Sequence, residues 1–151
     1  MANTARPISV LLVDDDPGDV LMIEEALGST GAPRTVYVVN DGEEALAFLR
    51  QTGQFSQAPR PDVVLLDLNM PRMDGRQVLA EVKADAKLRS IPIVVLTTSQ
   101  SPADIVSSYS LHANAYVTKP MNLDDLTEVV HKIDYFFARI AALPTQRPMA
   151  D

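Results

Sequence analysis

The stretch Ile8–Asp16, ISVLLVDDD, joins an uninterrupted apolar run to three consecutive acidic residues. Four more short apolar runs follow along the chain, each separated from the next by a stretch with helical character: Val36–Val39, Val63–Leu66, Ile93–Leu96 and Ala115–Val117. The runs are continuous rather than alternating and rich in Val, Ile and Leu, which is typical of parallel strands buried on both faces. The sequence therefore predicts five strands, of which Ile8–Val13 is the first.

The segments between these runs predict helices. Asp16 can cap the first helix with Pro17 at its first position, because both residue types favour helix starts. The other expected helices are Gly42–Gln51, Arg76–Lys83, Pro102–Leu111 and Leu123–Ala142. Strict alternation of strand and helix indicates an α/β fold, and right-handed crossovers give an open doubly wound sheet. We expect a flavodoxin-like, five-stranded parallel sheet in the order 2-1-3-4-5 with five helices.

Length and composition indicate one folded domain. The chain has 151 residues, of which 46% are hydrophobic and 22% charged, a profile that excludes disordered and coiled-coil proteins. We expect an N-terminal tail at 1–7, a domain at 8–143 and a C-terminal tail at 144–151.

Charge and cysteine content exclude several functions. Acidic residues outnumber basic ones 20 to 13, which disfavours a nucleic-acid partner. The absence of cysteine excludes disulfides, thiolate metal sites and a cysteine nucleophile. The first apolar run is too short for a signal peptide or a membrane span, so we expect a cytoplasmic protein with no membrane partner.

Acidic residues follow two strands that should be neighbours in this sheet. Asp14, Asp15 and Asp16 follow the first strand, and Asp67 follows the third. Ligands of open α/β sheets bind at the carboxyl ends of such neighbouring strands, and clustered carboxylates repel one another unless a cation neutralises them. Oxygen ligands without cysteine or a nearby histidine favour Mg²⁺, with Mn²⁺ as a substitute. We expect Asp14 and Asp15 to hold the metal and Asp16 to cap the helix.

Polar residues also follow the other two strands at this edge. Thr97 and Thr98 offer hydroxyl groups, and Lys119 offers a positive charge, so the set describes a phosphoryl-transfer site. The sequence contains no Walker motif or glycine-rich loop that would hold a nucleotide. A carboxylate can instead receive the phosphoryl group as an acyl phosphate. Asp67, which stands apart from the acidic pair, is the predicted phosphoacceptor.

Four motifs, LLVDDD, LLDLNMPRMDG, VVLTTS and YVTKP, together resemble the receiver domain of bacterial two-component response regulators. The resemblance runs in order from about Ile8 to Leu143. It implies a phosphoacceptor domain that assists its own phosphotransfer and dephosphorylation, and is not otherwise an enzyme. Asp67 would accept the phosphoryl group from a histidine kinase, and the backbone carbonyl of Asn69 would join the three carboxylates around Mg²⁺.

The same resemblance implies a conformational switch. Thr97 would bond the phosphate and shift inward, and Tyr116 would swing from an exposed to a buried position. Lys119 would pair with the phosphate across a cis peptide bond to Pro120. His112 stands where the family commonly has glycine before an Ala-Asn-Ala turn, so a positive φ at this residue would carry some strain.

A narrower resemblance covers QVLAEVKAD, VVLTTSQSPADI and EVVHKIDYFFARIAALP, which are similar to stand-alone response regulators that serve phytochrome-type histidine kinases. It implies such a kinase as the partner and signalling through a conformational or dimerisation change. A 20-residue last helix would be about 30 Å long, whereas a six-residue strand spans about 20 Å. Its end should overhang the sheet and expose three apolar residues, which a twofold homodimer would cover: Phe136, Phe137 and Ile140.

Two alternatives stay open. A metal-dependent phosphohydrolase with an aspartyl-phosphate intermediate would want a second acid two residues after Asp67, where this chain has Asn69. A pseudo-receiver that only binds a partner would be expected to lack Asp15, Asp67 or Lys119, and all three are present.

Overall fold

The computed structural model describes residues 8–28 and 34–144. The predicted tails at 1–7 and 144–151 therefore lie outside the described residues, except for residue 144. The elements follow one another in the order β1 (Ile8–Val13), α1 (Pro17–Gly28), β2 (Arg34–Val39), α2 (Gly42–Arg50), the short 3-10 helix η1 (Gly53–Phe55), β3 (Val63–Leu66), α3 (Gly75–Ala84), β4 (Ile93–Thr97), α4 (Pro102–Ser110), β5 (Ala115–Thr118), α5 (Leu123–Tyr135) and a π-helical turn, η2 (Phe136–Ile140).

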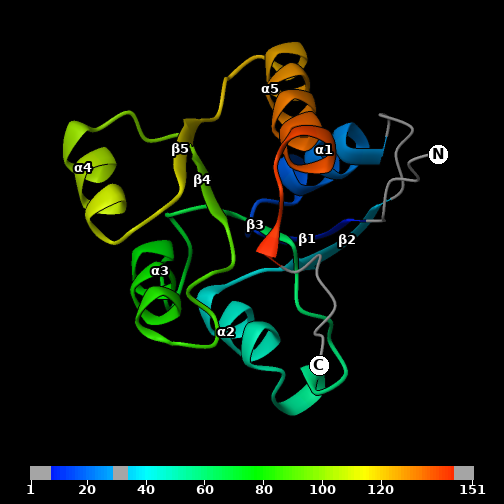
Figure 1. Ribbon diagram of the computed structural model, residues 1–151. Helices are drawn as coiled ribbons and strands as arrows, with labels where there is room; N and C mark the ends of the chain where they lie inside the picture. The colour runs from blue at the N-terminus through cyan, green and yellow to red at the C-terminus, as the bar shows by residue number, and fades with distance from the viewer. Residues whose placement is uncertain (1–7, 29–33, 145–151) are drawn as a thin grey trace.

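The five strands form one parallel sheet in the order β2-β1-β3-β4-β5, which confirms the predicted flavodoxin-like topology. Helices α1 and α5 cover one face of the sheet, and α2 and α3 cover the other (Figure 1). Because the order reverses between β1 and β3, the carboxyl ends of these two neighbours open the crevice in which such folds bind ligands.

Both faces of the central strands are buried, as their continuous apolar runs predict. Leu11 and Val13 of β1 belong to the core cluster under α2 and α3. Val10 and Leu12 alternate with them and belong to the cluster under α1 and α5. The two-residue period of a strand sends successive side chains to opposite faces, so an uninterrupted run is needed to fill both.

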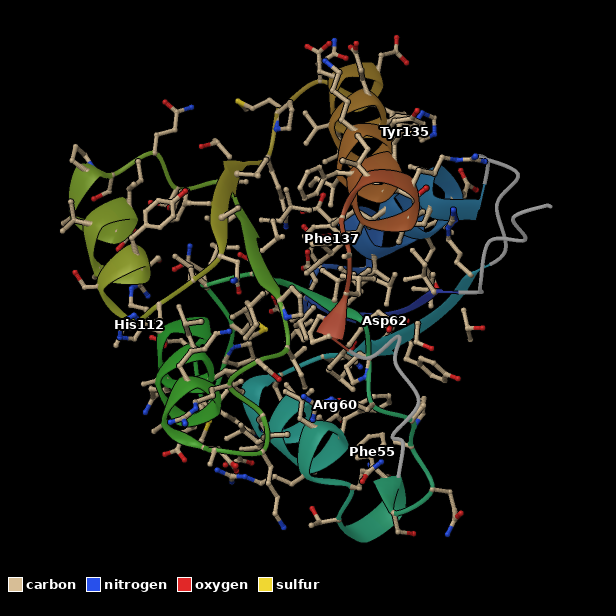
Figure 2. The ribbon with its side chains drawn as sticks, in the orientation of Figure 1. Phe55, Arg60, Asp62, His112, Tyr135 and Phe137 are labelled. Atoms are coloured by element: carbon tan, nitrogen blue, oxygen red, sulfur yellow. The ribbon has the colours of Figure 1, made fainter. Side chains whose placement is uncertain are left out.

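The last helix departs from the prediction. The α-helical part ends at Tyr135 and continues as the π turn η2, where a single 20-residue helix was expected. Phe136 and Ile140 are exposed at 47% and 62%, as expected. The expected exposure of Phe137 is wrong, because this ring is half-buried against the core between α5 and the sheet (Figure 2).

A turn with a left-handed residue links α4 to β5. His112 lies at the end of α4 (Figure 2) and has a φ of 73°, which confirms the strained backbone expected at a position where glycine is common. Its backbone N–H donates to the Tyr109 carbonyl, and the next N–H, of Ala113, donates to the Ser108 carbonyl. These two bonds end the helix and lead the chain into β5.

Within the part of the chain that the structure describes, no helix combines the length and apolar character that a membrane span requires.

Candidate phosphoryl-transfer site

Each candidate side chain lies at the carboxyl end of a strand. Asp14 directly follows β1, Asp67 follows β3, Thr97 is the last residue of β4, and Lys119 follows β5. Backbone hydrogen bonds extend the sheet by one step here, since the N–H of Asp14 donates to Val39 and that of Asp67 donates to Val13. The rigid sheet thus brings residues far apart in sequence to one edge.

Three carboxylates gather at this edge, as predicted. Asp14 and Asp67 are buried and Asp15 is exposed, and one oxygen from each lies within 4.8 Å of the others. Burial raises the pKa of the Asp14 carboxyl, and the nearby charge on Asp67 acts in the same direction; the hydrogen bond from Lys119 opposes both. Carboxylate oxygens at this spacing fit the ligand set of a hard divalent cation, whose charge would offset their repulsion.

Lys119 joins the acidic cluster through its buried ammonium group. Its Nζ lies 2.7 Å from Asp14 Oδ2, 2.8 Å from Asp19 Oδ2 and 3.3 Å from Asp67 Oδ2. Burial by itself lowers the pKa of this ammonium, but the bonds to Asp14 and Asp19 outweigh burial, and the net pKa is raised. Lys119 therefore stays charged beside the carboxylates.

The loop after Asp67 packs tightly against α3 through a glycine that the motif reading did not single out. A Cβ at Gly75 would lie 2.3 Å from the Asp67 carbonyl oxygen, so only glycine fits this close approach. The preceding residue, Asp74, caps α3 in a reciprocal arrangement with Gln77. The Asp-Gly pair in LLDLNMPRMDG was the available signal, because a cap followed by glycine marks a constrained helix start.

Asn69 and Thr97 also lie where the sequence places them. The Asn69 backbone N–H donates to Asp67 Oδ1 at 3.4 Å, so Asn69 lies beside the Asp67 carboxylate. Thr97 is fully buried, and its hydroxyl makes no hydrogen bond within the described part of the chain. A buried hydroxyl without a partner costs free energy. The Thr97 hydroxyl can therefore gain a hydrogen bond by donating to a group that enters the site.

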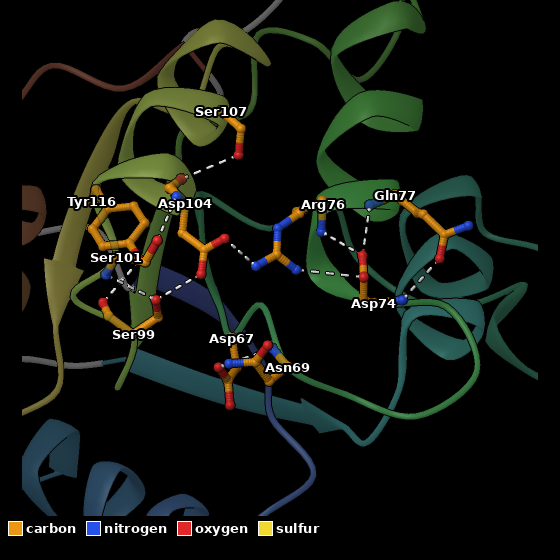
Figure 3. Close-up of polar contacts among 10 residues, drawn as sticks. All are labelled: Asp67, Asn69, Asp74, Arg76, Gln77, Ser99, Ser101, Asp104, Ser107 and Tyr116. Atoms are coloured by element: carbon orange, nitrogen blue, oxygen red, sulfur yellow. Dashed lines mark hydrogen bonds and ion pairs between the residues drawn. The ribbon is translucent and has the colours of Figure 1, made fainter.

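Tyr116 and the loop after β4 take part in a network that the sequence did not reveal (Figure 3). The Tyr116 hydroxyl donates to the Ser99 carbonyl at 2.9 Å, and the Ser99 hydroxyl donates to Asp104 Oδ2 at 2.6 Å. Asp104, in α4, forms an ion pair at 2.5 Å with Arg76 in α3. The network ties α3, α4 and β5 together, and Tyr116 is half-buried in it.

Asp16 caps α1 by accepting from the N–H groups of Gly18 and Asp19, as expected. The expected cis peptide bond between Lys119 and Pro120 is wrong for this structure, in which no described peptide bond is cis. The trans bond already allows Lys119 to reach the acidic cluster.

Asp19 contacts the Lys119 ammonium, and the sequence motifs do not single it out. It lies in the first turn of α1, and its only signal was its position three residues after the cap Asp16. A helix that begins at a strand end directs its first turn toward the same edge of the sheet, so this position alone places Asp19 near the site.

Comparison with known proteins gives the family. Residues 10–131 match the family described as "Response regulator receiver domain". The chain is 44% identical over 138 residues to the response regulator Rcp1 of Synechocystis sp., covering 91% of this chain and 94% of that protein. This chain belongs to the family of response regulator receiver domains.

Solved structures give the same result. The phosphorylated cyanobacterial phytochrome response regulator RcpA is 47% identical, with a TM-score of 0.90 over 93% of this chain and all of that chain. The Mn²⁺-bound form of Rcp1 is 43% identical, with a TM-score of 0.88 over 92% of this chain and all of that chain. The chain is thus similar to phytochrome response regulators along nearly its whole length.

Proposed function

We propose that this chain is a response regulator whose receiver domain, at 8–143, accepts a phosphoryl group on Asp67 in a Mg²⁺-dependent reaction. The observation that carries the proposal is that the buried Lys119 ammonium contacts both Asp14 and Asp67. These two carboxylates belong to the three-carboxylate cluster. Phosphoryl transfer needs positive charge around the phosphoryl oxygens and a positioned nucleophile, and this arrangement supplies both.

The donor is a phosphohistidine of a sensor histidine kinase. An oxygen of the Asp67 carboxylate attacks phosphorus, and an O–P bond forms while the P–N bond to the imidazole breaks. The electron pair stays on the imidazole nitrogen, which takes up a proton. Lys119 faces the transferred oxygens with its positive charge.

Asp14, Asp15 and Asp67 would hold Mg²⁺, or Mn²⁺ in its place, together with the backbone carbonyl of Asn69. The bound cation supplies charge that neutralises the phosphoryl oxygens during transfer. The Mn²⁺-bound form of the related Rcp1 supports a divalent cation in this family. The oxygen-only donor set of this chain fits the same class of ion.

The phosphoryl group would act as a signal through Thr97 and Tyr116. The buried Thr97 hydroxyl has no hydrogen-bond partner in the described part of the chain, so we expect it to move toward a phosphoryl oxygen and donate to it. Tyr116 is bonded to Ser99, only two residues after Thr97. A shift of Thr97 would therefore change the hydrogen bond between Tyr116 and Ser99. It would also change the surface that β4, α4 and β5 present.

A phytochrome-type histidine kinase is the proposed partner. RcpA, at 47% identity, is a cyanobacterial phytochrome response regulator, and similarity over nearly the whole chain supports a related partner here. Phosphotransfer from an autophosphorylated phytochrome-type kinase should be faster than transfer from a kinase of another class. Equal rates from both would contradict this choice of partner.

A homodimer through the C-terminal helix, with Phe136, Phe137 and Ile140 at its centre, completes the proposal. Phe136 and Ile140 are exposed, and the Phe136 ring packs edge-on against Phe137 with centroids 5.1 Å apart. Beside them, a groove of about 530 Å³ runs between β5 and η2. A second copy of this helix would cover both features.

Substitution of the phosphoacceptor tests the central claim. Asp67→Asn keeps the shape of the side chain but removes its ability to attack phosphorus. With acetyl phosphate and Mg²⁺, intact-mass measurement should show a phosphoryl adduct on the wild type and none on Asp67→Asn. Asp85→Asn makes the same change after α3, at the opposite edge of the sheet, and should behave as wild type. A hydroxylamine-resistant adduct on Asp67→Asn would overturn the assignment.

A further inference from the structure

Lys119 bonds to a third carboxylate that lies outside the metal-binding set. Asp19 approaches the ammonium to 2.8 Å, nearly as close as Asp14 at 2.7 Å and closer than Asp67 at 3.3 Å. Asp19 belongs to α1, so this bond connects a helix to the strand end where Lys119 is fixed.

The ammonium group has no donor to spare in this arrangement. A lysine ammonium has three N–H bonds, and three carboxylates accept from it. The Lys119 side chain is only 3% exposed, so water has little access to it. A phosphoryl group on Asp67 would add negatively charged oxygens near the ammonium. Lys119 can donate a hydrogen bond to one of them only if one of its present hydrogen bonds breaks.

Burial decides which bond is given up. The Asp14 side chain is 1% exposed, and loss of Lys119 would leave it as a buried carboxylate without its counter-charge, which is costly. The Asp19 side chain is 27% exposed, so water can replace Lys119 around it at small cost. Asp67 itself carries the phosphoryl group. The bond to Asp19 is therefore the one that breaks most easily.

We propose that Asp19 is a positioning residue that holds the Lys119 ammonium in the unphosphorylated chain and competes with the phosphoryl group for it. The inference rests on the proposed function, because it assigns a role toward a phosphoryl group on Asp67. Asp19 acts through Lys119, and not by direct contact with the phosphoryl group or with the expected Mg²⁺. It thereby weakens the binding of the phosphoryl group and keeps the unphosphorylated state favoured.

Beryllofluoride, which binds a carboxylate in the shape of a phosphoryl group, is the probe. We expect Asp19→Asn to lower the half-saturating beryllofluoride concentration in Mg²⁺ by roughly three- to tenfold, the range for a charged hydrogen bond partly screened by water. Amide NMR shifts of residues at the strand ends provide the titration signal. Asp19→Ala should give at least the same increase in affinity.

Two controls separate this role from a general charge effect. Glu25→Gln removes one negative charge from an exposed position of the same helix and should leave the affinity unchanged. Asp19→Glu keeps a carboxylate that can still reach Lys119 and should restore wild-type affinity. In a Lys119→Met background, Asp19→Asn should change the affinity by less than about twofold, because the coupling needs both partners.

The outcomes distinguish this inference from the proposed function. If the wild type binds beryllofluoride and Asp19→Asn binds it no more tightly, the inference on Asp19 is overturned while the proposed function stands. An equal gain in the Lys119→Met background would also overturn it, since the effect would then bypass Lys119. A wild type that binds no beryllofluoride in Mg²⁺ would overturn both.

Discussion

His112 shows a strain that one substitution can relieve. Its φ of 73° places a side chain in the left-handed region at the end of α4. We expect His112→Gly to raise the free energy of unfolding by about 0.5–1 kcal/mol, because the relief of strain exceeds the entropy that glycine adds to the unfolded chain. Urea denaturation provides the measurement. His131→Gly, inside α5, should instead lower the stability by about 1 kcal/mol. A less stable His112→Gly protein would contradict the prediction.

Asp15 differs from the other two clustered acids because it is exposed. Its removal costs little packing and relieves repulsion, so Asp15→Ala should melt at a higher temperature than the wild type in a metal-free buffer. The wild type should gain about 2.7 kcal/mol at a Mg²⁺ concentration a hundredfold above Kd, and Asp15→Ala should lose most of this gain.

Melting curves with and without Mg²⁺ check both expectations. Asp16→Ala is the matched control, because it removes the neighbouring acid, which caps α1. This variant should be destabilised by about 1 kcal/mol yet keep the response to Mg²⁺. A wild-type melting temperature that Mg²⁺ does not change would count against the metal site.

At the level of secondary-structure elements, the Arg76–Asp104 pair links α3 to α4. The Ser99 hydroxyl and the Arg76 guanidinium hold the pKa of the Asp104 carboxyl below its usual value of 3.8. Because the pKa is lowered in the folded state, the stabilisation is present above this value and is lost as pH falls below it. The ion pair between Arg76 and Asp104 is therefore fully charged at neutral pH.

Arg76→Gln should make α4 more mobile and weaken the hydrogen bonds that join Asp104, Ser99 and Tyr116. We expect faster hydrogen exchange of the α4 amides at neutral pH, with a difference from the wild type that shrinks as pH falls below 3.8. Arg50→Gln breaks another ion pair between helices, with Glu81, in which both side chains are largely exposed. It should leave α4 exchange unchanged. If Arg76→Gln did the same, the linking role of the pair would be wrong.

For the whole molecule, the proposed homodimer places the exposed end of α5 and η2 at its interface. Aromatic residues at the centre of an interface dominate its energy, so Phe136→Ala should cost about 2 kcal/mol of association, or roughly a thirtyfold weaker dimer. Sedimentation with and without beryllofluoride provides the measurement. Leu21→Ala removes an exposed apolar side chain from α1 and should not change association. A monomeric wild type at micromolar concentration would contradict the dimer.

Much of the fold and most of the site could be predicted from the sequence, because the strands are uninterrupted apolar runs in strict alternation with helices. That pattern leaves few ways to bury both faces of a sheet. The topology then places Asp14, Asp67, Thr97 and Lys119 at one edge before any coordinates are known. Strand 1 was predicted with the bounds of β1, whereas β2 begins two residues earlier than its apolar run.

The local sequence alone determined the strands, the cap at Asp16 and the residue types at the strand ends. Only the tertiary structure decided which side chains complete the site. Asp19 reaches Lys119 because α1 begins at the same edge of the sheet at which β5 ends. Arg76 reaches Asp104 because the first turns of α3 and α4 face each other (Figure 3). These partners are 100 and 28 residues apart. A contact over such a separation depends on the angle at which helices pack on the sheet, which no local pattern records.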